Sequence, residues 1–170
     1  MREINEIYIH CSALPYGSFV SIDGYHKKKG WCGVYCPVRE CQIYCGYNYV
    51  ILNEYPTKFN YDAQRPVPLN NGKVIVGRPE DAIPAHVEGK NTNSIGIVYV
   101  GVSITFYQLV ALKSLLQKVL KKYNLGIENV KGHYEVFGNA DEKEKLMKTC
   151  PNIRMDLFRN DLSHYLKGGD

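Results

Sequence analysis

The chain has 170 residues and a mass of 19.4 kDa, which is the size of one domain with one hydrophobic core. Apolar residues make up 45% of it and charged residues 22%, a globular composition that excludes a wholly disordered chain. The net charge of +4, from 21 basic and 17 acidic residues, is too balanced for a strong phosphate-binding surface. No apolar run reaches the roughly 18–20 residues of a membrane helix. We therefore expect no nucleic-acid partner and no membrane insertion.

The first predicted element is a strand over residues 6–12, in which two isoleucines alternate with Tyr8 and His10. His10 and Cys11 are therefore expected on opposite faces of a sheet. A nearly continuous apolar run over residues 94–100 predicts a central strand that is covered on both faces. Three further strands are predicted over residues 47–52, 73–76 and, with the exit from the strand, 129–136.

The strongest predicted helix begins at Thr105, because Thr105 and Gln108 have the types and spacing of a capping box. Apolar residues then recur at three- and four-residue steps as far as Tyr123. A short basic helix is predicted over residues 20–29, and an amphipathic one over residues 154–166. Strands that alternate with helices predict the α/β class, as a single domain with a central mixed β-sheet flanked by helices.

Two histidines have similar positions, because His10 and His133 each close a predicted strand. Cys150 follows in a loop that Pro151 keeps extended before the last helix. Two imidazoles and a thiolate form a sound ligand set for zinc, and three protein ligands leave one position open, as in catalytic sites. Each residue alone also has an ordinary structural interpretation, as a core or surface histidine or as a buried thiol.

Five motifs in chain order carry a resemblance to a known family. They are Ile9-His10-Cys11-Ser12-Ala13, Gly46-Tyr47-Asn48-Tyr49-Val50-Ile51, Ala85-His86 with Asn93-Ser94-Ile95-Gly96-Ile97, Gly132-His133-Tyr134-Glu135-Val136, and Lys148-Thr149-Cys150-Pro151. In this order they resemble the zinc-dependent N-acetylmuramoyl-L-alanine amidases. That superfamily also includes bacteriophage amidase-type lysozymes and peptidoglycan recognition proteins. The resemblance spans residues 7 to about 165, nearly the whole chain.

The resemblance implies a peptidoglycan recognition protein/amidase-like fold and a specific reaction. The reaction is hydrolysis of the amide between N-acetylmuramic acid and the L-alanine of the stem peptide, in peptidoglycan or a muropeptide. Zn²⁺ is the implied cofactor. The implied residues are the zinc ligands His10, His133 and Cys150, the catalytic residues Tyr47 and Lys148, and the substrate-binding residues His86 and Asn93.

The implied roles suit the chemistry of these side chains. The ammonium group of Lys148 can stabilise the oxyanion of a tetrahedral intermediate, and Tyr47 can orient water or assist proton transfer. Glu135 lies two residues after His133, where it either supports that ligand or is a solvated carboxylate.

A cysteine-rich stretch at about residues 32–45 departs from the family pattern as an insertion within the single amidase domain of residues 1–170. Its C-x3-C-x4-C-x3-C spacing differs from the x2 spacing of a zinc knuckle, so disulfides or free thiols are favoured over a second metal site. The four residues concerned are Cys32, Cys36, Cys41 and Cys45.

The sequence leaves alternatives open for the function of the protein and for the place where it acts. Some members of the superfamily only recognise peptidoglycan, but they lack the cysteine ligand, and Cys150 is present here. The start of the chain has no secretory signal, so we expect a soluble monomer made in the cytoplasm that acts on the cell wall after release. A phage lysin, a wall-recycling enzyme and an injected effector all satisfy this expectation.

Overall fold

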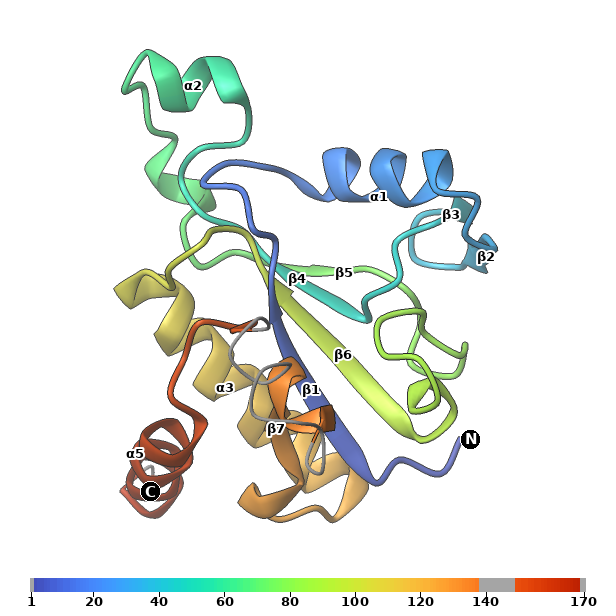
Figure 1. Ribbon diagram of the computed structural model, residues 1–170, viewed down its shortest axis with the longest axis vertical. Coiled ribbons are helices and arrows are strands. Elements are labelled where there is room, and N and C mark those ends of the chain that lie inside the picture. Colours follow the sequence, from blue (N-terminus) through green and yellow to red (C-terminus); the bar gives the residue numbers. More distant parts are fainter. Residues whose placement is uncertain (1, 138–148, 169–170) are drawn as a thin grey trace.

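A mixed five-stranded sheet forms the centre of the protein in a computed structural model that describes residues 2–137 and 149–168 (Figure 1). The strand order is β5-β4-β6-β1-β7, and every neighbouring pair is parallel except the antiparallel pair β4 and β5. This confirms the predicted α/β class with a mixed sheet. The strands are β1 (Glu6–Cys11), β4 (Tyr49–Ile51), β5 (Val74–Val76), β6 (Ser94–Tyr99) and β7 (Val130–Gly132).

The middle strand of the sheet is β6, and all six of its residues are buried, as its continuous apolar run predicted. Helices cover both faces of the sheet (Figure 1). Ile7 and Ile9 of β1 pack toward α3 and α5 in the main hydrophobic core. On the opposite face, Val98 and Val100 pack with apolar residues of α1 in a smaller cluster.

Four α-helices of the described residues accompany the sheet. The predicted basic helix is α1 (Phe19–Lys28), the capped helix is α3 (Phe106–Tyr123) and the last helix is α5 (Met155–Lys167); a short α2 (Lys58–Asp62) also forms. Single 3₁₀ turns are η1 (Pro68–Asn70), η2 (Asn91–Asn93) and η3 (Ile127–Asn129), and a longer one is η4 (His133–Phe137). Within residues 2–137 and 149–168, no helix combines the length and apolar character needed to cross a membrane.

The predicted capping box starts α3 and also joins it to the sheet. The Thr105 hydroxyl accepts from the Gln108 amide at 3.1 Å, and the Gln108 side chain accepts from the Thr105 amide at 3.0 Å. The buried Gln108 Nε2 then donates to the carbonyls of Ile51 and Val100. At the other end of α3, Asn124 adopts a left-handed conformation with φ 52° and ends the helix.

The cysteine-rich stretch forms a separate two-stranded hairpin, β2 (Val34–Cys36) with β3 (Cys41–Ile43). Cys36 and Cys41 lie directly opposite each other in the hairpin, and all four cysteines of residues 32–45 are free thiols. The buried Arg78 guanidinium anchors the base of the hairpin, because it donates to the carbonyls of Cys32, Cys45 and Ile83. Hydrogen bonds from one buried side chain to backbone carbonyls thus fix the hairpin to the domain.

Glu80 connects the sheet to the end of α3. Its carboxylate accepts from the hydroxyl groups of Tyr49 and Tyr123 and pairs with Lys122. Burial alone would raise the pKa of Glu80, but the hydrogen bonds from Lys122, Tyr49 and Tyr123 outweigh it and lower the pKa below its ordinary value. Folding therefore favours the ionised carboxylate.

Leu116→Ala tests the main core. Leu116 is completely buried in α3, so its truncation should lower the free energy of unfolding by about 2–5 kcal/mol. Val110→Ala on the same helix is the control, because Val110 is 45% exposed and its loss should change stability by about 0.5 kcal/mol or less. Urea denaturation of both variants measures the difference. Equal effects of the two substitutions would contradict the described burial.

Glu80→Gln tests the linkage of stability to pH. Because the folded protein holds the Glu80 pKa below the unfolded value of 4.5, the stabilisation is present above pH 4.5 and is lost as the pH falls through the folded pKa. The variant should therefore be less stable than the parent at neutral pH, and the difference should shrink in acid. The exposed Glu88→Gln is the control, and a pH-independent difference for Glu80→Gln would refute the linkage.

Candidate functional site

Parallel pairing brings the two predicted histidine ligands together. Ile9 of β1 lies opposite Gly132 of β7, so the next residues, His10 and His133, leave neighbouring strands side by side. Their ring centroids are 4.6 Å apart. His10 is buried with 2% of its surface exposed, and His133 is partly exposed. The site therefore forms where the strands end, as expected for a parallel sheet.

Cys150 reaches the same point from the loop before α5. Its Sγ lies 3.9 Å from His10 Nδ1 and accepts from the Cys11 backbone amide at 3.3 Å. The Tyr134 amide donates to the Cys150 carbonyl at 2.9 Å, and the Tyr99 hydroxyl donates to the Pro151 carbonyl. Backbone contacts on both sides of the thiol thus hold it against the histidines.

Gly132 allows this loop to approach β7. A Cβ atom at residue 132 would lie only 2.8 Å from both Pro151 Cδ and Met155 Cγ. The missing side chain therefore makes the space for the segment that carries Cys150. A glycine inside a strand often marks such a close approach.

The three predicted ligands fit the donor set of a metal ion. One ligand atom each from His10, His133 and Cys150 lies within 4.8 Å of the others, and no second group of this kind occurs in the described part of the chain. A tetrahedral zinc ion with Zn–N of about 2.0–2.1 Å and Zn–S of about 2.3 Å separates its N and S ligands by roughly 3.6 Å. The observed 3.9 Å between Cys150 Sγ and His10 Nδ1 is close to this spacing.

The surroundings keep the buried imidazoles neutral. Burial, followed by the neighbouring His86 and His133, lowers the pKa of His10 well below its ordinary value. Burial lowers the pKa of His86 to about 3. A neutral imidazole has one unprotonated nitrogen, which is the form that binds a metal ion.

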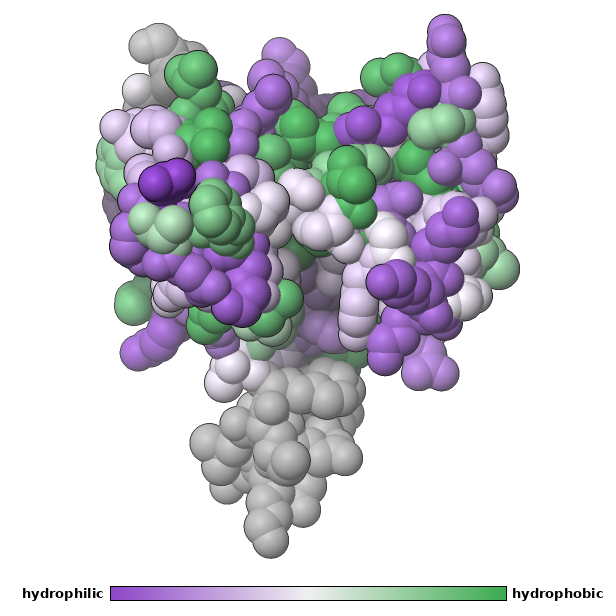
Figure 2. All heavy atoms as spheres, turned by 90° about the horizontal axis from the view of Figure 1, so that it is seen from above, coloured by the Kyte–Doolittle hydropathy of each residue, from purple (hydrophilic) through white to green (hydrophobic). Residues whose placement is uncertain are grey.

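Tyr47 lies beside the ligand cluster, with its ring centroid 5.1 Å from that of His10. Burial raises the pKa of the Tyr47 phenol, so the phenol stays protonated and can donate a hydrogen bond at neutral pH. Tyr47 also lines a cavity of about 540 Å³ together with the segment after β1 and with α1. Other lining residues are Cys11, Ser12, Leu14, Tyr16, Ile22, Tyr25 and His26. Figure 2 looks onto the side of the molecule that carries α1 and α2 and shows that this face is hollowed.

The two predicted substrate-binding residues occupy different places. His86 is buried behind His10, and its Nδ1 lies 3.0 Å from His10 Nε2. Asn93 lies before β6, where its carbonyl accepts from the Asn5 amide at 2.8 Å. This is the opposite end of β1 from His10, roughly 16 Å away at the rise of a strand.

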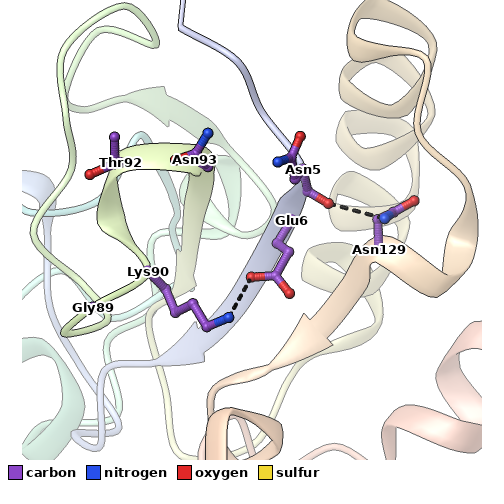
Figure 3. A pocket seen from close by; sticks show the side chains of 7 residues that line it. All are labelled: Asn5, Glu6, Gly89, Lys90, Thr92, Asn93 and Asn129. Carbon is purple, nitrogen blue, oxygen red and sulfur yellow. Dashed lines mark hydrogen bonds and ion pairs between the residues drawn. The ribbon is translucent and has the colours of Figure 1, made fainter.

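A second cavity, of about 470 Å³, lies at that far end and is polar (Figure 3). Asn93, Asn5 and Asn129 line it together with an ion pair of 3.7 Å between Lys90 and Glu6. The structure therefore does not bring Asn93 together with the cluster of His10, His133 and Cys150.

Lys148 and Glu135 are the remaining residues that the sequence singled out. Lys148 lies outside the described residues. Glu135 forms a bidentate ion pair with Arg159, at 2.9 Å for both contacts, and accepts from the Gly132 amide at 2.8 Å. It therefore supports the end of β7, from which His133 emerges.

Sequence reasoning missed the contacts that Cys11, Ser94 and Gly96 make around the site. Cys11 lies next to Cys150, Ser94 contacts His86 at 3.1 Å, and Gly96 lies under the His86 ring. All three belong to the motifs quoted above, and a glycine within the apolar run of β6 was the available signal for a close approach.

Comparisons with known proteins agree with this architecture, although the chain matches no protein-family model. It is 30% identical over 165 residues to the endolysin of Escherichia phage T7, covering 90% of this chain and 82% of the relative. Among solved structures, the N-acetylmuramoyl-L-alanine amidase LysC from Clostridium intestinale URNW has a TM-score of 0.66 at 23% identity, covering 95% and 87% of the two chains. Drosophila PGRP-LB has a TM-score of 0.58 at 20% identity, covering 89% and 76%. The structural similarities confirm the predicted fold.

Gly132→Ala tests the packing that positions Cys150. The added methyl group overlaps Pro151 and Met155, so the variant should lose about 1–3 kcal/mol of stability. Gly24→Ala in α1 is the matched control, because a Cβ there meets nothing within 4 Å and should stabilise the helix by up to about 1 kcal/mol. Denaturation midpoints of both variants provide the comparison. An unchanged Gly132→Ala protein would show that the Cys150 loop does not pack as described.

Proposed function

The chain belongs to the family of the T7-type phage endolysins, and we propose that it hydrolyses the amide bond between N-acetylmuramic acid and the L-alanine of the peptidoglycan stem peptide. One observation carries this proposal. Two imidazoles and a thiol meet at the ends of β1 and β7 and in the loop before α5, beside a groove that Tyr47 lines. The T7 relative is an endolysin, and the LysC structure is an N-acetylmuramoyl-L-alanine amidase.

We propose that His10, His133 and Cys150 hold one zinc ion. Two nitrogens and one sulfur suit zinc, and a third protein ligand without a fourth leaves a position for water or substrate. When bound, zinc supplies a Lewis acid that polarises the scissile carbonyl and activates water at neutral pH. Magnesium and calcium prefer oxygen ligands, so they do not suit this donor set.

The surrounding side chains would stabilise charge and position the substrate. The protonated Tyr47 phenol can donate to an oxygen of the substrate that becomes negative during attack. Lys148 is proposed to add a positive charge near the same oxyanion, by its position two residues before Cys150. The groove beside Tyr47 would hold the glycan and stem peptide, and its aromatic side chains suit the sugar rings.

One chain contributes all three ligands and the groove, so a monomer suffices for the proposed activity. The proposed substrate lies outside the cytoplasmic membrane, so an endolysin made in the cytoplasm has to be released before it can act on the wall. Family membership favours this route over wall recycling or injection by a secretion system.

Recognition of peptidoglycan without cleavage is the second candidate function. The structural similarity to Drosophila PGRP-LB supports this candidate, because a peptidoglycan recognition protein and an amidase share this fold. Cys150 favours catalysis here, because it completes the ligand set. Bound metal without release of peptide would favour recognition.

Cys150→Ser and His133→Ala test the metal centre. Each variant should lose bound zinc and the release of stem peptide from purified peptidoglycan together, because each removes one of three ligands. Elemental analysis and peptide assays with and without a chelator provide the measurements, and Cys41→Ser in the hairpin is the control. A Cys150→Ser protein that keeps zinc and full activity would contradict the proposed ligand set.

Tyr47→Phe and Lys148→Ala test catalysis separately from metal binding. Each variant should bind zinc normally but cleave more slowly, by about 100–1,000-fold for the loss of an oxyanion donor. Steady-state release of peptide and zinc content are measured on the same preparations. Full activity of either variant would remove that residue from the proposed catalytic set.

A further inference from the structure

We infer that His86 and Ser94 are positioning residues that hold the His10 imidazole in the tautomer whose Nδ1 lone pair faces the metal centre. This inference rests on the zinc site of the proposed function. It assigns His86 to the support of a metal ligand, in place of the substrate contact that the resemblance implied. One series of hydrogen bonds behind the site supports this assignment.

The series of hydrogen bonds runs from the backbone carbonyl of Lys90 to the imidazole of His10. Ser94 Oγ donates to the Lys90 carbonyl at 2.8 Å and lies 3.1 Å from His86 Nε2. His86 Nδ1 in turn lies 3.0 Å from His10 Nε2. The last ring nitrogen in the chain, His10 Nδ1, faces Cys150 Sγ at 3.9 Å.

The Lys90 carbonyl determines which atom donates in each of these hydrogen bonds. A carbonyl oxygen can only accept, so the single Ser94 hydroxyl proton is directed at Lys90. Ser94 Oγ must then accept from His86 Nε2–H, which leaves a lone pair on His86 Nδ1. His10 therefore donates through Nε2–H, and its own lone pair lies on Nδ1.

The opposite assignment of donors and acceptors is less favourable, because it leaves one acceptor without its donor. If His10 carried its proton on Nδ1, His86 would have to donate through Nδ1 and Ser94 would have to donate to His86 Nε2. Ser94 would then leave the Lys90 carbonyl, and His10 would point a proton at the metal site. A metal-binding histidine usually donates its second N–H to a carboxylate, carbonyl or water, so a second imidazole in this place is distinctive.

Contacts with β6 and with Asn91 fix the position of His86. The ring lies over Gly96 of β6, where a Cβ atom would come within 2.5 Å of His86 Cδ2. Asn91 Oδ1 accepts from the backbone amides of His86 and Val87, both at 2.9 Å. His86 is only 8% exposed, and both of its ring nitrogens have partners inside the protein. The ring is therefore placed to orient His10 and not to contact a ligand in the groove.

The tautomer itself is measured first, in metal-free protein labelled with ¹⁵N at histidine. Nitrogen chemical shifts of the rings distinguish a protonated from an unprotonated nitrogen. We expect His10 and His86 both to carry their protons on Nε2 before any zinc is added. A His10 ring protonated on Nδ1, or an equal mixture of both forms, overturns the inference.

Zinc affinity of four variants then measures the consequence, with zinc alone as the probe in competition with a chromophoric chelator. His86→Leu should weaken binding by about 10–100-fold, the usual effect of removing the partner of a metal ligand. His86→Asn should recover part of this loss, because its amide oxygen can accept near the position of Nδ1. Ser94→Ala should cost about fivefold, the effect of one neutral hydrogen bond. Gly96→Ala should also weaken binding, because it displaces the His86 ring.

His26→Leu is the matched control, since His26 is another buried histidine, 5% exposed and stacked on Trp31 at 4.0 Å. It should lower stability without lowering zinc affinity. If His86→Leu does not fold, Ser94→Ala and the tautomer measurement still decide the question. Wild-type zinc affinity in folded His86→Leu overturns the inference whatever the activity. Tight zinc binding by the parent without amide cleavage would instead overturn the proposed reaction and leave the inference intact.

Discussion

The in-register parallel pairing of β1 with β6 and β7 is the constraint on which the site depends. Ile9 lies opposite both Ile97 and Gly132, so the register of three strands is fixed at one residue of β1. The next residue of β1 is His10, and the next residue after β7 is His133. A slip of one residue would turn His10 into the hydrophobic core and separate the two imidazoles. The hydrophobic pattern of β1 thus brings together the two histidines that we propose as metal ligands.

Alternation along the same strand separates stability from function. Ile7 and Ile9 face α3 and α5 in the main core, whereas Tyr8 and His10 face the side that carries His86. Burial on that side then removes water from the imidazoles and keeps them neutral, so they are ready to bind a metal ion. The polar groups on this side are hydrogen-bonded, and no buried side-chain nitrogen or oxygen in the described residues lacks a partner.

Much of the fold could be predicted because periodicity and capping are local. The alternation in β1, the apolar run of β6 and the Thr105 capping box each predicted an element that the structure contains. The strand predicted over residues 47–52 is shorter, Tyr49–Ile51, and the Asn48 side chain just before it bonds to the carbonyls of Arg78 and Pro79. Such contacts across 30 residues leave no periodic trace in the sequence.

The site was predictable to a smaller extent. Motif order identified the three residues that the structure brings together, and strand ends explain why two of them meet. The same motifs placed His86 and Asn93 in one substrate-binding group. In the structure His86 lies beside His10, whereas Asn93 lines the polar cavity at the other end of β1. Their separation depends on how residues 86–93 turn back along the sheet, which neither composition nor spacing encodes. The hydrogen bonds that link His10, His86 and Ser94 to the Lys90 carbonyl likewise exist only after folding.

Identification of the bond that is cut in purified peptidoglycan tests the central claim most directly. Mass spectrometry of the products from zinc-loaded protein would define the new ends of the glycan and of the peptide. Amide hydrolysis predicts stem peptides that begin with free L-alanine, together with glycan strands that keep intact N-acetylmuramic acid. New reducing sugar ends, or intact peptidoglycan despite one bound zinc per chain, would contradict the assignment of an amidase.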